Sequence, residues 1–263
     1  MRVRSRVFWL PKDPGYAAEY EDACALDLHR GRAAIADGVS SAIFSGIWAR
    51  ILTEAAVADP PDVQNPEFWD WLAQRRQQWS AAIDPASLTF FQRGKLQQCG
   101  GAFSTLLWLE WQLQGGAIHW RCKALGDGGL LHVRDGRLLA AFPIAASDDL
   151  HADPLTVASA PRSADQFLEF GSAEGAAHAG DWLVLTTDAL LGWALRNYEA
   201  GLPPDWDEMW NLSDDDFAAR VAGWRDTRAI RADDTTLMLL QVSDDIVEPA
   251  PDGEIDDTDD NAD

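Results

Sequence analysis

Strict alternation of apolar and polar residues marks several short stretches of the chain as β-strands that bury one face. The clearest stretch is residues 117–125, in which Ile118, Trp120, Cys122 and Ala124 alternate with His119, Arg121 and Lys123. Residues 130–133 and 138–142 follow, and the Asp135-Gly136 pair between them is a strong signal for a hairpin turn. Further strand candidates are residues 3–9, 24–28, 32–36, 102–111, 181–186 and 235–242.

A spacing of four residues between apolar positions predicts the helices. Apolar residues recur at this spacing from Ile43 to Leu52, and Asp59-Pro60-Pro61 would end that helix. Asn65-Pro66 has the form of an N-cap and a first helical residue. Ser213 with Asp216 resembles a capping box. Helices early and late around a hairpin-rich centre favour an α+β fold of antiparallel sheets covered by helices over a βαβ array.

The composition predicts one folded domain with an acidic tail. The chain has 263 residues, of which 47% are hydrophobic and 13 are tryptophan, so it can bury a sizeable core. Its net charge is −22, and the last twenty residues contain Asp and Glu but no Lys or Arg. We therefore predict a domain over residues 1–243 and a disordered, solvated tail over residues 244–263.

Charge and cysteine content exclude several functions and compartments. An acidic chain lacks the basic surface that binding to nucleic acid requires. Cys24, Cys99 and Cys122 are widely spaced, which argues against a disulfide framework and a structural zinc site. No apolar run has the length of a signal-peptide core or a membrane span. We expect a cytoplasmic protein, monomeric, with no membrane partner.

Carboxylates recur where apolar strands begin or end. Asp37 and Asp188 each follow an apolar run, and Glu21-Asp22 and Asp233-Asp234 each precede one. Any one of them could be a turn, a helix cap, a loop acid or part of a solvated face. If they converge, carboxylates about 4 Å apart repel by roughly 4 kcal/mol per pair at an effective dielectric constant of 20, and cations are needed. Oxygen ligands without Cys or His indicate Mg²⁺ or Mn²⁺ rather than zinc.

Five short motifs occur in order along the chain: Glu21-Asp22-Ala23, Ala36-Asp37-Gly38, Gly126-Asp127-Gly128, Thr187-Asp188-Ala189 and Asp233-Asp234-Thr235-Thr236. Through them, residues 1–243 resemble the PP2C-type (PPM) metal-dependent serine/threonine phosphatases, and most closely their divergent bacterial members. The resemblance implies a four-layer α-β-β-α sandwich with a two-metal centre at one edge. It also implies hydrolysis of phosphoserine or phosphothreonine in proteins, by attack of a hydroxide that bridges the two ions.

The resemblance also assigns roles to residues. Asp37 would bridge both ions, and the carbonyl oxygen of Gly38 would bind one of them. Asp188 and Asp233 would bind the other, with Asp22 as an outer-shell or water-mediated ligand. Asp127 matches an acid that holds a third, weaker ion in bacterial members, and its alternative is a hairpin turn.

Two departures from the family pattern keep other functions open. Lys12 stands near the position of an arginine that grips the phosphate, where it would supply a point charge without the bidentate fork; a solvated lysine is its alternative, and Arg4 and Arg6 are further candidates. Val39 replaces a histidine thought to protonate the leaving group. The alternatives are therefore a weak or inactive regulatory or binding module, and a structural sandwich without metal. Residues 145–179 are expected to form a mobile flap near the centre.

Overall fold

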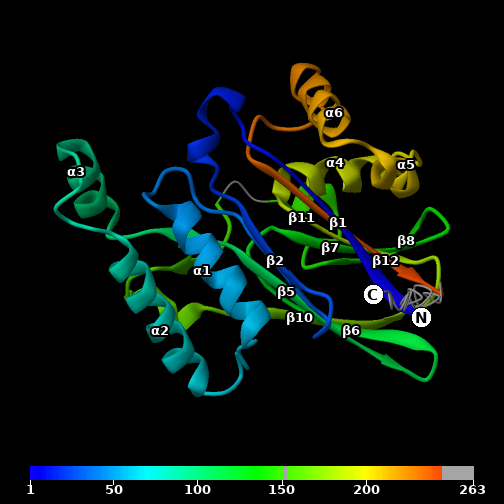
Figure 1. Cartoon of the computed structure of the whole chain (residues 1–263), viewed down its shortest axis with the longest axis horizontal. Helices are drawn as coiled ribbons and strands as arrows, with labels where there is room; N and C mark the ends of the chain where they lie inside the picture. Colours follow the sequence, from blue (N-terminus) through cyan, green and yellow to red (C-terminus); the bar gives the residue numbers. More distant parts are fainter. Residues whose placement is uncertain (151–152, 245–263) are drawn as a thin grey trace, which may run out of the picture.

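Two five-stranded antiparallel sheets form the body of the protein (Figure 1). The computed structural model describes residues 1–150 and 153–244. Sheet A contains, in spatial order, β1 (Arg2–Leu10), β12 (Thr235–Ser243), β11 (Trp182–Thr186), β7 (Gly129–Arg134) and β8 (Arg137–Phe142). Sheet B contains β10 (Gly171–Ala177), β6 (Ala117–Leu125), β5 (Leu106–Gln114), β3 (Arg32–Ala36) and β2 (Ala23–Asp27). A separate two-stranded ladder joins β4 (Phe103–Ser104) to β9 (Val157–Ala158).

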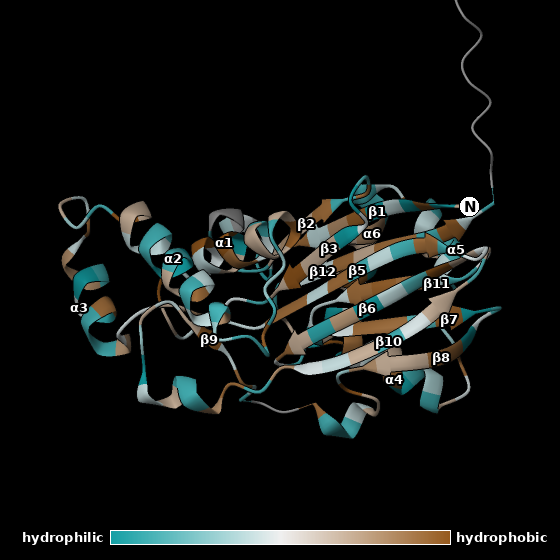
Figure 2. Cartoon of the chain, turned by 90° about the horizontal axis from the view of Figure 1, so that it is seen from below, coloured by the Kyte–Doolittle hydropathy of each residue, from teal (hydrophilic) through white to brown (hydrophobic). Residues whose placement is uncertain are grey.

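Helices cover the outer face of each sheet. Those on sheet B come early in the chain and are α1 (Ser45–Ala58) and α2 (Glu67–Ala82), which α3 (Phe90–Cys99) follows. Those on sheet A are α4 (Asp188–Glu199), α5 (Trp206–Asn211) and α6 (Asp214–Asp226). Short 3₁₀ helices are η1 (Pro14–Glu19), η2 (Ser147–Asp149) and η3 (Ser163–Phe167). None of the residues of α3 is buried, and both views show this helix projecting beyond the sheets (Figures 1 and 2).

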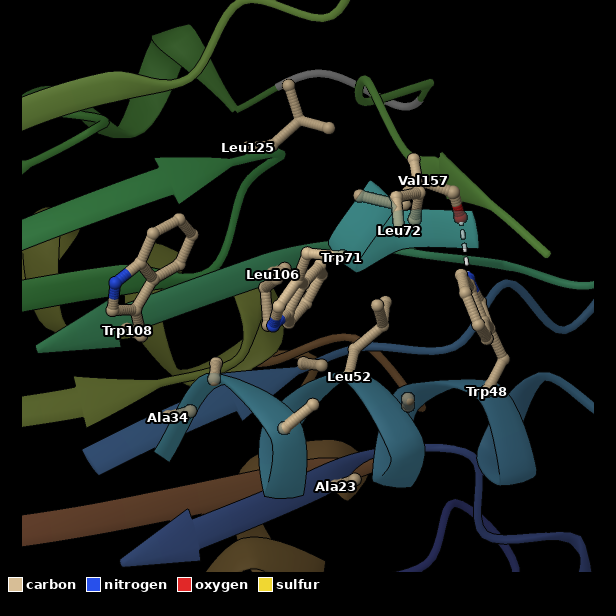
Figure 3. Packing of buried hydrophobic residues seen from close by; sticks show 14 of the residues in the cluster. Ala23, Ala34, Trp48, Leu52, Trp71, Leu72, Leu106, Trp108, Leu125 and Val157 are labelled. Carbon is tan, nitrogen blue, oxygen red and sulfur yellow. Dashed lines mark hydrogen bonds between the residues drawn. The ribbon is translucent and has the colours of Figure 1, made fainter. Parts of the chain in front are cut away.

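Three apolar cores separate the four layers. Leu107, Leu183 and Met238 belong to the core between the two sheets. Trp48 and Leu52 of α1 pack in the core outside sheet B, where the Trp48 Nε1 donates to the Val157 carbonyl oxygen at 2.8 Å (Figure 3). A third core joins sheet A to α4, α5 and α6. The predicted α+β sandwich of two antiparallel sheets flanked by helices is therefore confirmed.

Several local predictions are confirmed residue by residue. β3 has the predicted bounds, 32–36. Asp135 and Gly136 have φ angles of 48° and 71°, which is the type I′ geometry that an Asp-Gly hairpin favours. The Ser213 hydroxyl accepts from the Asp216 N–H at 3.1 Å as the N-cap of α6. α2 begins one residue later than predicted, with Pro66 rather than Asn65 at the N-cap, although the Asn65 side chain accepts from the Glu67 N–H at 3.1 Å. These contacts satisfy N–H groups that have no partner within their own helices.

Two predictions for the middle of the chain are wrong. The strand expected over 102–111 is divided into β4 and β5, and β5 runs on to Gln114. The segment 145–179 is not a single irregular flap, because it contains η2, β9, η3 and the edge strand β10. β10 is rich in Gly and Ala, which have low strand propensity, so pairing with β6 rather than local preference makes it a strand.

The predicted acidic tail lies, from residue 245 onward, outside the described residues. Within residues 1–150 and 153–244, no helix combines the length and apolar character needed to cross a bilayer.

Candidate functional site

Antiparallel pairing brings the acid-bearing strand ends to one edge of the sandwich. In sheet B, Ala23 at the start of β2 pairs with Ala36 at the end of β3. In sheet A, Thr186 at the end of β11 pairs with Leu237 near the start of β12 and with Gly129 at the start of β7. The link Gly126-Asp127-Gly128 joins β6 of sheet B to β7 of sheet A, so it crosses between sheets and is not a hairpin turn.

Four of the predicted carboxylates line one cavity of about 160 Å³ at this edge, here called the acid cavity. They are Asp37, Asp127, Asp188 and Asp233. The remaining wall is formed by Gly38, Val39, Ser40, Thr105, Pro154 and Arg231. Residues separated by almost two hundred positions in the sequence thus share one small polar space.

Asp22 lies close to the acid cavity without lining it. It is buried, and its Oδ2 accepts hydrogen bonds from the Thr187 hydroxyl at 3.0 Å and the Thr236 hydroxyl at 2.7 Å. The Thr187 hydroxyl also accepts from the Thr236 N–H at 3.1 Å. These bonds tie the start of β2 to the edge of sheet A, and they leave the other Asp22 oxygen for a different partner.

The acids influence one another strongly. Burial, together with the charges of Asp22, Asp233 and Asp127, raises the pKa of Asp37 well above the ordinary range of an aspartate. Burial raises the pKa of Asp22 to about 7, and the charges of Asp234 and Asp233 contribute to the rise. The same environment that penalises a bare carboxylate favours a bound cation, because a cation removes the repulsion.

The donor set fits a hard divalent cation, although the side chains do not form a finished site. Within the described ranges, no three His, Cys, Asp or Glu side chains are grouped as a ready-made metal site. Asp188 instead makes an ion pair through its Oδ2 with Arg231. However, Oδ1 of Asp22 and Oδ1 of Asp188 are buried without a hydrogen-bond partner, and such oxygens are stabilised by a cation. All the candidate donors are oxygens, which suits Mg²⁺ or Mn²⁺.

The two aspartates at the start of β12 have different surroundings. Asp233 lines the acid cavity, whereas the buried Asp234 accepts the backbone N–H groups of Lys12 and Glu21, each at 2.7 Å. Asp234 therefore fixes the segment around residues 12–21 against sheet A. The sequence alone could not separate these two roles, because both residues directly precede the same strand.

Lys12 lies next to the acid cavity rather than in it. Its Nζ donates to the Ser40 hydroxyl at 2.8 Å and lies 3.4 Å from Glu21 Oε2. Ser40 lines the acid cavity, so the Lys12 ammonium contacts a residue of the cavity wall without lining the cavity itself. The role of Lys12 on phosphate stays a prediction.

The structure places Arg4 and Arg6, the further candidates for a phosphate contact, away from the acid cavity. Arg6 donates to the Trp210 carbonyl oxygen at 2.5 Å and lies over the Phe8 ring, and Arg4 lies over the Trp210 ring. Both side chains pack on the outer face of sheet A toward α5, because alternate residues of a strand face opposite sides of its sheet. Neither lines the acid cavity.

The sequence reading missed Arg231 and Thr105. The Thr105 hydroxyl accepts from the Asp37 N–H at 2.9 Å, and the Thr105 N–H donates to the Asp37 carbonyl oxygen at 2.9 Å. This reciprocal pair fixes the Asp37 backbone. The available signal for Arg231 was a base two residues before Asp233 in an acid-rich chain. His151 lies outside the described residues, and none of the other four histidines lines the acid cavity.

Gly38 is required by close packing. A Cβ on Gly38 would lie 2.6 Å from the Glu21 carbonyl oxygen and 2.9 Å from Ser45 Cβ. We expect Gly38→Ala to lower the free energy of unfolding by about 1–3 kcal/mol, because backbone must shift to admit the methyl group. Gly223→Ala is the matched control, since a Cβ there meets nothing within 4 Å and Ala is the better helix former. Urea unfolding measures both, and equal stabilities for Gly38→Ala and wild type would contradict the packing argument.

The raised pKa of Asp22 gives stability a definite pH dependence. In EDTA, between about pH 4 and pH 7, folded Asp22 holds a proton that the unfolded chain has released, so the free energy of unfolding falls as pH rises. Asp22→Asn keeps a hydrogen-bond acceptor but removes this titration. We expect it to be more stable than wild type by about 2–4 kcal/mol above pH 7, with the difference vanishing below pH 4. Urea unfolding at several pH values measures the difference, and a gap independent of pH would contradict this assignment.

Comparison with known proteins places the fold. Neither a model of any protein family nor any curated protein matches the sequence. Solved structures do match. The serine/threonine phosphatase PstP/Ppp of Mycobacterium tuberculosis is 15% identical, with a TM-score of 0.57, and the match covers 92% of this chain and 100% of that one. PppA, described as a key regulatory component of T6SS in Pseudomonas aeruginosa, is 18% identical, with a TM-score of 0.56 and coverage of 92% and 98%.

A third match is the catalytic domain of PstP in complex with two manganese ions. It is 16% identical, with a TM-score of 0.55, and the match covers 92% of this chain and 99% of that one. These matched structures are PP2C-type serine/threonine phosphatases. The two antiparallel sheets and their helices match the fold of these structures over 92% of this chain. The chain therefore has the PP2C fold.

Proposed function

We propose that this chain is a metal-dependent phosphohydrolase that removes phosphate from phosphoserine or phosphothreonine in proteins, with residues 1–243 as the working domain. The observation that carries the proposal is the convergence of Asp37, Asp127, Asp188 and Asp233 on one small cavity. The fold shared with serine/threonine phosphatases supports it, as does the manganese complex of one of them.

The chain's own residues would hold two Mg²⁺ or Mn²⁺ ions, with a third at Asp127. Asp37 and the Gly38 carbonyl would bind on the sheet B side of the cavity, and Asp188 and Asp233 on the sheet A side. Asp22 would act from the outer shell, through its unpartnered Oδ1. Bound dications supply Lewis acidity, which activates water and neutralises the charge of phosphoryl oxygens.

The remaining residues position and balance this centre. Thr105 fixes the backbone of Asp37 through two hydrogen bonds. Arg231 and Lys12 place positive charge at the edge of the acid cavity, where a phosphate dianion would arrive. The Val39 side chain has no ionisable group, so it cannot protonate the leaving group as an imidazole at this position would.

A regulatory module that binds without turnover is the second candidate. The observation that favours it is the engagement of both nearby bases, because Arg231 pairs with Asp188 and Lys12 contacts Glu21 and Ser40. Calorimetry separates the two functions. Binding of Mn²⁺ and a phosphopeptide without release of phosphate would favour the module.

The direct test is hydrolysis of p-nitrophenyl phosphate. We expect activity that rises with added Mn²⁺ and is lost in excess EDTA, because the acid cavity needs cations to accept a phosphate dianion. Full activity in excess chelator would contradict the proposal.

The ion pair between Arg231 and Asp188 predicts competition with the metal. The Arg231 side chain is 56% exposed, so the pair is partly screened by solvent and is worth about 1 kcal/mol at most. We expect Arg231→Gln to bind Mn²⁺ about two- to fivefold more tightly than wild type in calorimetry. Arg93→Gln on α3, outside the acid cavity, is the control. Weaker binding by Arg231→Gln would show that Arg231 supports the metal site rather than competing for it.

A further inference from the structure

A second, larger cavity adjoins the acid cavity at Ser40. Its volume is about 460 Å³, within the range of ligand pockets, and Ser40 lines both cavities. The other lining residues come from the segment before β2, from the start of α1 and from α3. We call this space the Ser40 groove. Because the two cavities adjoin, a peptide with its phosphorylated residue in the acid cavity can place neighbouring residues in the Ser40 groove.

The Ser40 groove collects positive charge in a chain that is otherwise acidic. Lys12 and Lys95 both reach Ser40: the Lys12 Nζ donates to its hydroxyl at 2.8 Å, and the Lys95 Nζ donates to its carbonyl oxygen at 3.3 Å. Arg50 of α1 also lines the groove and is exposed. Glu19 and Glu21 are the acids of the groove, and Glu21 is paired with Lys12. Three bases thus stand against two acids, and Lys95 and Arg50 are the two bases that are not paired with Glu21.

Apolar side chains of the groove belong partly to the core, because Ile43 is buried and Phe44 packs against the core outside sheet B, whereas Ile47 remains accessible. Ile43, Phe44 and Ile47 supply apolar surface, and Ile47 is 37% exposed. α3 supplies Gln92 and Lys95, yet none of its residues is buried in the core. In Figures 1 and 2, α3 projects past the sheets. α3 therefore lies at the end of the sandwich where Leu10 of β1 pairs with Thr235 of β12, next to the acid cavity. The N-terminus lies at the opposite end (Figure 1).

We propose that the Ser40 groove binds acidic residues that flank the phosphorylated residue of a protein substrate, with Lys95 and Arg50 as the bases that select them. The proposal rests on the phosphatase function proposed above. Charge complementarity carries it, because opposite charges across an interface favour the right partner and suppress wrong ones. The residues that flank the phosphorylated residue are the expected occupant, because the peptide chain joins them to the phosphorylated residue in the acid cavity.

The test compares two phosphothreonine peptides that differ only in their flanks, one with Asp and Glu and one with Ser and Gln. An exposed ion pair changes affinity by up to about fivefold, so two bases predict a kcat/KM about tenfold higher for the acidic peptide at low salt. We expect the preference to shrink as salt is added. In Arg50→Glu/Lys95→Glu, the ratio should fall to one or below. Arg93→Glu, exposed on α3 but outside the groove, should keep the wild-type ratio.

The ratio separates this proposal from loss of folding and from failure of the proposed function. Both peptides are measured on the same protein sample, so a smaller folded fraction lowers both rates and leaves the ratio unchanged. p-Nitrophenyl phosphate has no flanks and tests hydrolysis alone. If wild type hydrolyses it but shows a ratio of one, or if the double variant keeps the wild-type ratio, the Ser40 groove proposal is overturned while the phosphatase function stands. If wild type hydrolyses neither p-nitrophenyl phosphate nor the peptides, the proposed function itself fails.

Discussion

Replacing Asp37 by Asn should lower kcat/KM for p-nitrophenyl phosphate by about 10³-fold or more. Asp37 follows β3 directly and lines the acid cavity together with Asp127, Asp188 and Asp233. In the function proposed above, Asp37 would hold both ions, and an amide offers a neutral oxygen in place of a charged carboxylate, so the substitution would weaken the site for both. A loss of about 4 kcal/mol of transition-state stabilisation corresponds to this factor.

The Asp37→Asn variant should fold, which makes its activity interpretable. Because burial and neighbouring acids raise the pKa of Asp37, a neutral side chain relieves repulsion in the metal-free protein. The matched control is Asp135→Asn in the turn between β7 and β8, where Asn also tolerates the positive φ of 48°. The control should keep full activity. An Asp37→Asn variant with more than a tenth of wild-type activity would show that Asp37 does not bridge the ions.

Manganese should stabilise the folded protein strongly. A ligand that binds only the folded state adds about 2.7 kcal/mol at one hundred times its dissociation constant. For a domain of this size, that gain raises the melting temperature by about 5–10 °C. The physical reason is the repulsion among the buried acids, which the ions replace by attraction. Differential scanning calorimetry with Mn²⁺, and then with excess EDTA, measures the shift and its reversal.

Two variants determine whether the stabilisation comes from the acid cavity. Asp188→Asn should lose most of the Mn²⁺ shift, because Asp188 contributes a buried oxygen without a hydrogen-bond partner. Asp135→Asn should keep the wild-type shift, since the turn is remote from the cavity lining. An equal shift in wild type and Asp188→Asn would place the stabilising ions elsewhere on this acidic protein.

Local patterns predicted the strands of the two sheets with the exception of the edge strand β10. β11 and β12 are buried on both faces, between the central core and the core of α4–α6, so their apolar runs are continuous and easy to find. β10 escaped prediction because a strand of Gly, Ser and Ala depends on its partner β6. α3 escaped because none of its residues is fully buried and Leu96 alone does not make an apolar stripe, although it packs against the core outside sheet B.

The acids could be found in the sequence because each directly precedes or follows an apolar strand. The residues that contact them could not be found in this way. Thr105 and Arg231 reach the acid cavity through tertiary contacts that leave no periodic trace in the sequence. Asp233 and Asp234 are adjacent in sequence, yet Asp233 lines the acid cavity and Asp234 binds the backbone of Lys12 and Glu21. Only the three-dimensional structure distinguishes these two environments. Arg4 and Arg6 had the right charge, but their strand directs them toward Trp210.

An anomalous difference map from a crystal grown with Mn²⁺ tests the central claim most directly. The account predicts two strong peaks inside the cavity lined by Asp37, Asp188 and Asp233, with a weaker third near Asp127. Loss of the peaks in Asp37→Asn crystals would confirm the assignment. A map at saturating Mn²⁺ with no peak in this cavity would contradict it.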